Sequence, residues 1–252
     1  MSRTHIHGNL RALEAVQEDL KLQAPDLVVN LGDHVSGPLQ AAATADVLMD
    51  STYLQIRGNH DRQLTDRTPS QMGSSDYAAH EQLNGRHFAW LQSLPATQMV
   101  NDILLCHGSP QDDLEYLLEE VAGEVVQLAP PQRIRERMAH IDASIVLCGH
   151  THVPRAVRLA GGPLIVNPGS VGLQAYDDTR PHSHYVETGS PHARYAILDR
   201  DKGRLKVNFI ALEYDCEAAA REAAAANRPD WAHALATGYA LRVGETSAAS
   251  LP

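Results

Sequence analysis

The sequence predicts an α/β (α+β) fold, with strands and helices alternating through residues 1–150, then mainly strands, then a helical tail. Two observations carry this prediction. Short apolar runs typical of buried strands end in small turns, many of which contain glycine, and segments with helical spacing separate several of these runs. The 252 residues are 43% hydrophobic and 21% charged. This ordinary globular composition excludes disordered, fibrous and coiled-coil proteins.

The helices are predicted from periodicity. Apolar residues recur at three- and four-residue steps from Leu10 to Leu20, which predicts a helix over 10–22 with Asn9 as its cap. Further helices are expected over 77–93, 115–126 and 133–139. The alanine-rich segment 216–242 predicts a packed helical pair, whose second helix begins at Pro229.

The strands are predicted from short runs rich in β-branched and apolar residues. We expect them at 26–31, 52–56, 103–106 and 144–148, as two strands within 156–166, and as a hairpin of 193–199 with 204–213. Residues 173–192 are rich in His, Pro, Asp and Gly and are expected to form a long loop. In that loop, Arg180, His182 and His184 either line a substrate entrance or belong to a solvated or interface loop.

Charge and cysteine content limit the classes of partner. The chain has 21 basic and 31 acidic residues, a net charge of −10, which disfavours nucleic acid and anionic membranes as partners. A local metal site would still allow an anionic substrate. No apolar segment approaches the roughly 20 residues that cross a bilayer, and the N-terminus lacks an apolar signal core. With only three widely spaced cysteines, we expect a cytoplasmic protein without a membrane partner.

Residues of metal-ligand type gather in the turns that follow the apolar runs, and an H-x-H pair precedes the first helix. Parallel strands deliver their carboxyl ends to one crevice, so these side chains are expected to meet. Imidazole, carboxylate and amide donors together suit Mn, Fe, Zn, Co or Ni. The candidate residues are His5, His7, Asp33, Asn59, His60, His107, His150 and His152.

Each of these motifs is weak alone, but their order is hard to obtain by chance. The set H-x-H, G-D, G-N-H-D, C-H-G, G-H-T-H and N-P-G-S resembles the calcineurin-like metallophosphoesterases, in a small bacterial phosphodiesterase-like branch that is also similar to diadenosine tetraphosphatases and serine/threonine phosphatases. The resemblance runs from His7 to about Asp199 and implies a four-layer fold, a two-sheet β-sandwich flanked by helices. We expect a single domain over 1–243, with the helical pair 215–243 packed on it and a flexible tail at 244–252.

The resemblance also implies a centre of two divalent metal ions. His7, Asp33 and His152 would hold one ion, and Asp33 would bridge to a second ion held by Asn59, His107 and His150. A metal-activated hydroxide would hydrolyse a phosphodiester or phosphomonoester bond of a small substrate. His60 would be the catalytic residue that approaches the leaving oxygen or the phosphoryl oxygens, and Asp61 would either orient His60 or cap a turn. Because the family often forms dimers, the resemblance also allows a homodimer of this chain.

Two features depart from the family pattern. His5 stands where the family has an aspartate, and only residues 1–4 precede it as a first strand. Either the start of the chain is truncated or altered, or His5 is a true metal ligand that replaces an anionic donor with a neutral one. A degenerate member that serves as a non-catalytic metal-binding or protein-binding scaffold is therefore the alternative function. Two other classes of metalloenzyme are disfavoured. Amidohydrolase barrels also begin with H-x-H, but they need more strand–helix units than this chain has. Metallo-β-lactamases need the motif H-x-H-x-D-H, whereas His7 is followed by Gly-Asn-Leu.

Overall fold

The computed structural model describes residues 2–3, 5–138 and 141–242, so the predicted tail at 244–252 lies outside the described residues. Its helices are α1 (Leu10–Gln23), α2 (Ala41–Met49), α3 (Asn59–Asp66), α4 (Ser74–His80), α5 (Gly85–Ser93), α6 (Pro131–Met138), α7 (Cys216–Ala225) and α8 (Pro229–Thr237). Its strands are β1 (Ser2–Arg3), β2 (Val29–Asn30), β3 (Leu54–Gln55), β4 (Thr97–Val100), β5 (Ile103–Cys106), β6 (Glu119–Ala122), β7 (Val125–Leu128), β8 (Ile145–Leu147), β9 (Arg155–Arg158), β10 (Leu164–Asn167), β11 (Ala175–Asp178), β12 (His184–Glu187), β13 (Ala193–Asp201) and β14 (Arg204–Leu212).

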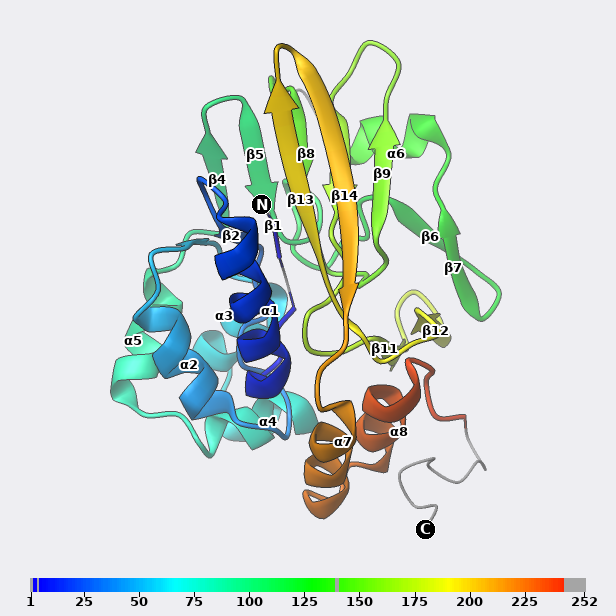
Figure 1. Ribbon diagram of the computed structural model, residues 1–252. Coiled ribbons are helices and arrows are strands. Elements are labelled where there is room, and N and C mark those ends of the chain that lie inside the picture. The colour runs from blue at the N-terminus through cyan, green and yellow to red at the C-terminus, as the bar shows by residue number, and fades with distance from the viewer. Residues whose placement is uncertain (1, 4, 139–140, 243–252) are drawn as a thin grey trace.

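Two five-stranded sheets form the centre of the molecule (Figure 1). The first has the order β14-β13-β1-β2-β3 and the second the order β4-β5-β8-β10-β9. One buried cluster joins the facing sides of the sheets, with Val29 and Ala196 from the first sheet and Leu105 and Val166 from the second. The apolar strand runs are therefore explained by burial between two sheets.

Helices cover the outer faces of this sandwich. The apolar stripe of α1 packs with Tyr195 of β13, while the next residue, Ala196, faces the other sheet, as the alternation of a strand requires. The side chain of Asn9 accepts a hydrogen bond from the backbone N of Ala12, so the predicted cap of α1 is confirmed. On the other outer face, Ile134 of α6 packs against the second sheet. The predicted sandwich flanked by helices is thus confirmed.

Two local predictions were wrong, and they share a cause. Residues 115–126, predicted to be helical, contain β6 and the start of β7, which turn at Gly123 with φ +64°. Residues 173–192, predicted to be a loop, contain β11 and β12. These strands form a third sheet in the order β11-β12-β7-β6, in which Tyr185 pairs with Val125. In both segments, pairing between neighbouring strands of a hairpin has overridden the local sequence pattern.

The predicted helical pair is present near the end of the chain. Pro229 lies in the first turn of α8, and Asp215 caps α7 by accepting a hydrogen bond from Ala218 N. Trp231 of α8 packs in a buried cluster with Leu173.

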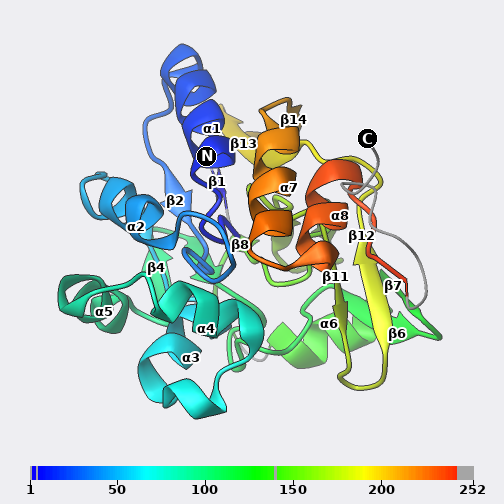
Figure 2. The same ribbon diagram turned by 90° about the horizontal axis from the view of Figure 1, so that it is seen from below.

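Seen from below, α2 to α5 lie on one side of the molecule and strands β6, β7, β11 and β12 on the other (Figure 2). Across the described part of the chain, no helix combines the length and apolar character needed to cross a membrane.

Candidate metal centre

The predicted ligands meet where the parallel strands of the two central sheets end. β1, β2 and β3 pair in parallel, as do β5, β8 and β10, so the turns that follow them point to one end of the sandwich. Among the described residues, two groups have ligand atoms within 4.8 Å of one another. The groups are His5 with Asp33 and His107, and His7 with Asp33 and His152.

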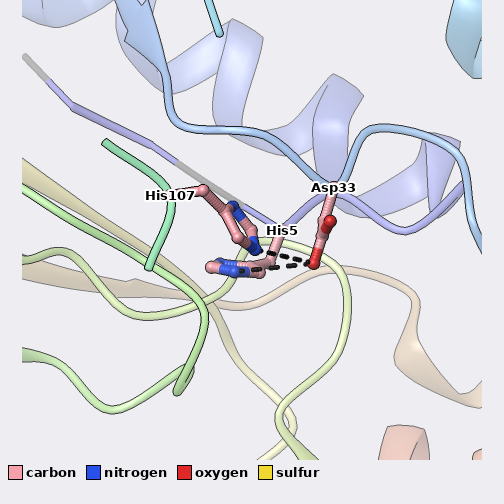
Figure 3. Close-up of side chains that lie close together, drawn as sticks. All are labelled: His5, Asp33 and His107. Atoms are coloured by element: carbon pink, nitrogen blue, oxygen red, sulfur yellow. Dashed lines mark ion pairs between the residues drawn. The ribbon is translucent and has the colours of Figure 1, made fainter. Parts of the chain in front are cut away.

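Asp33 lies at the centre of both groups. Its Oδ2 atom is 3.2 Å from Nε2 of His107, 3.8 Å from Nε2 of His5 and 3.9 Å from Nε2 of His7. Figure 3 shows His5 and His107 directed at this oxygen from separate turns. Burial disfavours the charged form of Asp33, but the imidazoles of His107 and His60 outweigh it and hold the pKa of Asp33 well below its usual value.

The backbone of the site is strained at five predicted ligands. Their φ angles lie in the left-handed region, which residues other than glycine adopt rarely. Such strain persists only where surrounding structure enforces it, and it clusters at functional sites. The residues are His5 (φ 56°), His7 (φ 52°), Asp33 (φ 56°), His150 (φ 66°) and His152 (φ 57°).

The hydrogen bonds of His7 and His152 fix which ring nitrogens carry hydrogen. Nδ1 of His7 lies 3.1 Å from the carbonyl oxygen of Ser36, and Nδ1 of His152 lies 2.8 Å from that of Leu173. A carbonyl can only accept, so each Nδ1 is the donor. Burial lowers the pKa of His7 to about 4 and holds the pKa of His152 well below its usual value, so both rings are neutral at pH 7.

It follows that two Nε2 lone pairs face each other at a distance of 3.3 Å. That contact is repulsive unless a cation lies between or beside the two nitrogens. The donor set of His7, His152 and Asp33 therefore fits a divalent ion.

In the second group, His107 also uses Nδ1 to bind a backbone carbonyl and directs Nε2 at other predicted ligands. Its Nδ1 atom donates to the carbonyl oxygen of Leu31 at 2.7 Å, while Nε2 lies 3.0 Å from Oδ1 of Asn59 and 3.2 Å from Oδ2 of Asp33. Burial opposes a charged ring, but Asp33 raises the pKa of His107. One nitrogen thus faces two oxygen acceptors, so either a proton or a bound cation must lie there.

His5 and His150 occupy the site differently from the other ligands. His5 belongs to one ligand group, but its Nε2 accepts a hydrogen bond of 2.6 Å from the backbone N of His150. His150 belongs to neither described group; its Nε2 donates to the carbonyl oxygen of Leu114 at 3.2 Å, and its ring centroid is 5.3 Å from that of His107. Burial lowers the pKa of His150 to about 3. Metal binding by both residues stays a prediction.

His60 lies beside the ligand cluster and is held from two sides. Its backbone N donates to Oδ1 of Asp33 at 3.0 Å, and its ring Nδ1 lies 2.7 Å from Oδ1 of Asp76. Asp76 in turn accepts a hydrogen bond of 2.7 Å from the hydroxyl of Ser36. Burial opposes protonation of His60, but Asp33 and Asp76 outweigh it and raise its pKa to about 9. The side chain is 32% exposed and is therefore accessible to a substrate.

Asp76 is a site residue that the sequence did not reveal, because it lies in the first turn of α4 without any motif around it.

Of the two roles left open for Asp61, the structure shows the turn-capping one. Asp61 Oδ2 accepts hydrogen bonds of 2.8 Å from the backbone N of Gly58 and of Asp33 and lies 2.7 Å from Nδ1 of His34. Asp61 therefore fixes the two ligand-bearing turns to each other.

Gly58 allows these two turns to approach. A Cβ atom at this position would lie 2.6 Å from Asp33 N and 2.7 Å from Cε1 of His107. We therefore expect Gly58→Ala to lower the free energy of unfolding by about 1–3 kcal/mol, as overpacking typically does. Gly85→Ala is the control, because no described atom beyond its chain neighbours and its own helix backbone lies within 4 Å of that Cβ position. Equal urea midpoints for both variants would contradict this account.

A cavity opens over the ligand cluster. Of the three loop residues considered as an entrance, only Arg180 lines it; His182 binds the carbonyl oxygen of Gly123, and buried His184 binds the hydroxyl of Tyr116. The ring of Trp231 meets that of His7 edge-on, with 5.9 Å between centroids. The cavity walls beyond the ligands include Tyr176, Asp177, Asp178, Arg180, Arg228, Asp230 and Trp231.

Comparison with known proteins identifies a family and a relative of this chain. The family model described as a calcineurin-like phosphoesterase superfamily domain matches residues 1–190. An uncharacterized protein of Methanocaldococcus jannaschii is 23% identical over 242 residues, covering 90% of this chain and 92% of that protein.

Solved structures show the same fold. A metallophosphoesterase from Sphaerobacter thermophilus superimposes with a TM-score of 0.72 at 25% identity, covering 94% of this chain and 97% of the other. A hypothetical protein from Pyrococcus horikoshii OT3 superimposes with a TM-score of 0.71 at 20% identity, with the same coverage of 94% and 97%.

Proposed function

The chain belongs to the calcineurin-like phosphoesterase superfamily, and from this membership we propose that it is a metal-dependent phosphoesterase with two divalent ions at the Asp33 cluster. The facing Nε2 lone pairs of His7 and His152, 3.3 Å apart and both neutral, carry the proposal. Strained ligands around a shared carboxylate support it. The donor set favours Mn, Fe, Zn, Co or Ni.

When bound, two such cations activate a water as the nucleophile near neutral pH and offset negative charge on the phosphoryl oxygens. Asp33 would hold such ions through the carboxylate that is common to both ligand groups. His60 is held by Asp76 through Nδ1, so its other ring nitrogen is available to donate a proton to the leaving oxygen. Asp61 keeps the Asp33 and Gly58 turns together throughout.

We further propose a small phosphoester as the substrate. The cavity over the cluster is bounded by the β11–β12 hairpin, which contributes Arg180, and by α8, which contributes Trp231. Walls on two sides suit a compact molecule better than a polymer, and the net charge of −10 disfavours long nucleic acid.

Removal and return of metal tests this function. The protein with added Mn²⁺ is expected to hydrolyse bis-p-nitrophenyl phosphate, to lose that activity in excess chelator and to regain it when Mn²⁺ is restored. Metal analysis is expected to give about two ions per chain. A chain that binds metal but shows no turnover of phosphodiesters or phosphomonoesters with Mn, Co, Ni or Zn would instead support the scaffold alternative. A chain that binds no metal would overturn the metal centre itself.

A further inference from the structure

A chain of buried polar contacts lies behind the His150–His152 turn and ends on the carboxylate of Glu119. This side chain, at the start of β6, is only 1% exposed. Its Oε2 accepts a hydrogen bond of 2.9 Å from the hydroxyl of Thr151, and its Oε1 accepts one of 2.9 Å from Nε of Arg155. A buried carboxylate is unfavourable unless such partners are present, so Glu119 needs both donors.

The direction of this chain of hydrogen bonds is fixed by Asn167. Its Nδ2 group donates to the carbonyl oxygen of Gly149 at 2.8 Å and to the hydroxyl oxygen of Thr151 at 3.0 Å. Because the Thr151 oxygen accepts there, its single proton is left to donate to Glu119. Glu119 is thus the final acceptor, and Thr151 is held from both sides.

Thr151 is the residue between two strained predicted ligands. His150 has φ 66° and His152 has φ 57°, and residues other than glycine are uncommon in this region, although histidine enters it more often than most. The surrounding structure must therefore hold the turn in place. Glu119 is itself anchored, because Nη1 of Arg137 donates to its carbonyl oxygen at 2.8 Å.

We propose that Glu119, acting through Thr151, is a positioning residue that holds His150 and His152 in their metal-binding arrangement. The inference rests on the proposed metal centre but assigns a role outside it. Among the described residues, Glu119 makes no hydrogen bond to a predicted ligand side chain, and it lines a neighbouring cavity, shared with His150, rather than the cavity over the cluster. Its contribution is expected in the affinity for metal. A purely structural role, fixing β6 to the second sheet, would instead change only the stability of the fold.

Thr151 offers a matched pair of variants. Thr151→Val keeps the shape but removes the hydroxyl, which leaves Glu119 without one donor, whereas Thr151→Ser keeps the hydroxyl. The full chain, stripped with chelator, is titrated with Mn²⁺ by calorimetry, and the metal-free protein is melted in parallel. We expect Thr151→Val to weaken Mn²⁺ binding about tenfold or more, in the range for residues that orient metal ligands, and Thr151→Ser to stay within about twofold of wild type.

Glu119→Gln provides a second, less disruptive change. A carboxamide has one acceptor oxygen, so it can keep the contact with Thr151 or with Arg155 but not both. The neighbouring Glu120→Gln is its control, since Glu120 contacts Gln127 on the exposed side of the hairpin. We expect weaker Mn²⁺ binding for Glu119→Gln and wild-type binding for Glu120→Gln.

The outcomes separate the two proposals. If wild type binds Mn²⁺ and both Thr151→Val and Glu119→Gln bind it equally well, the positioning role is wrong even where their melting temperatures fall, and the metal centre stands. If Thr151→Val fails to fold, Glu119→Gln against Glu120→Gln decides alone. If wild type binds none of Mn²⁺, Co²⁺, Ni²⁺ and Zn²⁺ in the same titration, both the metal centre and the positioning role are overturned.

Discussion

Replacing Asp33 by asparagine is expected to remove most of the bound metal and to lower kcat by about 10²–10³-fold, the scale of losing a group that stabilises the transition state directly. Among the predicted ligands Asp33 alone carries negative charge, because the others are histidines and Asn59. Asp33 also belongs to both ligand groups. Losing it should therefore affect both ions.

The variant Asp33→Asn is chosen because it can keep the contact that orders the neighbouring turn. An amide oxygen at Oδ1 still accepts the hydrogen bond from the backbone N of His60. The amide nitrogen then replaces Oδ2 and directs its hydrogens at the imidazoles of His107, His5 and His7, where the cations would lie. The fold should survive while the metal site is lost.

Metal per chain, measured by mass spectrometry after gel filtration, is expected to fall from about two to below one, with kcat measured in the same samples. Asp102→Asn is the control, because Asp102 is a partly exposed residue paired with Arg200 away from the cavity. Retention of two ions and of wild-type kcat by Asp33→Asn would show that the cluster is not the catalytic centre.

The convergence of the ligands could be predicted because its signals are local. Asp33 and His107 each follow an apolar run in a glycine-containing turn, and parallel pairing of the strands brings such turns to one end of a sheet. The two-sheet sandwich was predicted from the resemblance of the ordered motifs to the calcineurin-like metallophosphoesterases. The local signals did not give the hydrogen-bond arrangement of His5, whose Nε2 accepts from the backbone of a residue 145 positions away.

The residues that support the site could not be predicted, because their partners are distant and their surroundings carry no pattern. Asp76 is a single carboxylate at the start of a helix, and it acts on the ring of His60, 16 residues earlier. Glu119 lay in a segment predicted to be helical, and its partner Thr151 follows 32 residues later. Its strand pairs with β7 in a hairpin, which joins β12 in the third sheet, and this pairing outweighs the local helical pattern.

His60 is expected to produce the other large effect. His60→Gln should lower kcat by about 10²–10⁴-fold, the usual contribution of a positioned proton donor. Asp76→Asn should produce a smaller loss of about tenfold, because the ring of His60 stays but loses the carboxylate that orients it. Metal content should be unchanged in both variants, since neither side chain belongs to a described ligand group. Asp66→Asn, on the exposed end of α3, is the control.

Two substrates separate the roles that remain open for His60. A p-nitrophenolate leaving group departs readily without a proton, whereas an alkoxide requires one. If His60 protonates the leaving oxygen, His60→Gln should slow a diester with an alkyl leaving group much more than bis-p-nitrophenyl phosphate, and Asp76→Asn should shift the ratio in the same direction. Equal slowing of both substrates would place His60 on the phosphoryl oxygens instead. Because the ratio compares two substrates on one variant, a general loss of folded protein cannot produce it.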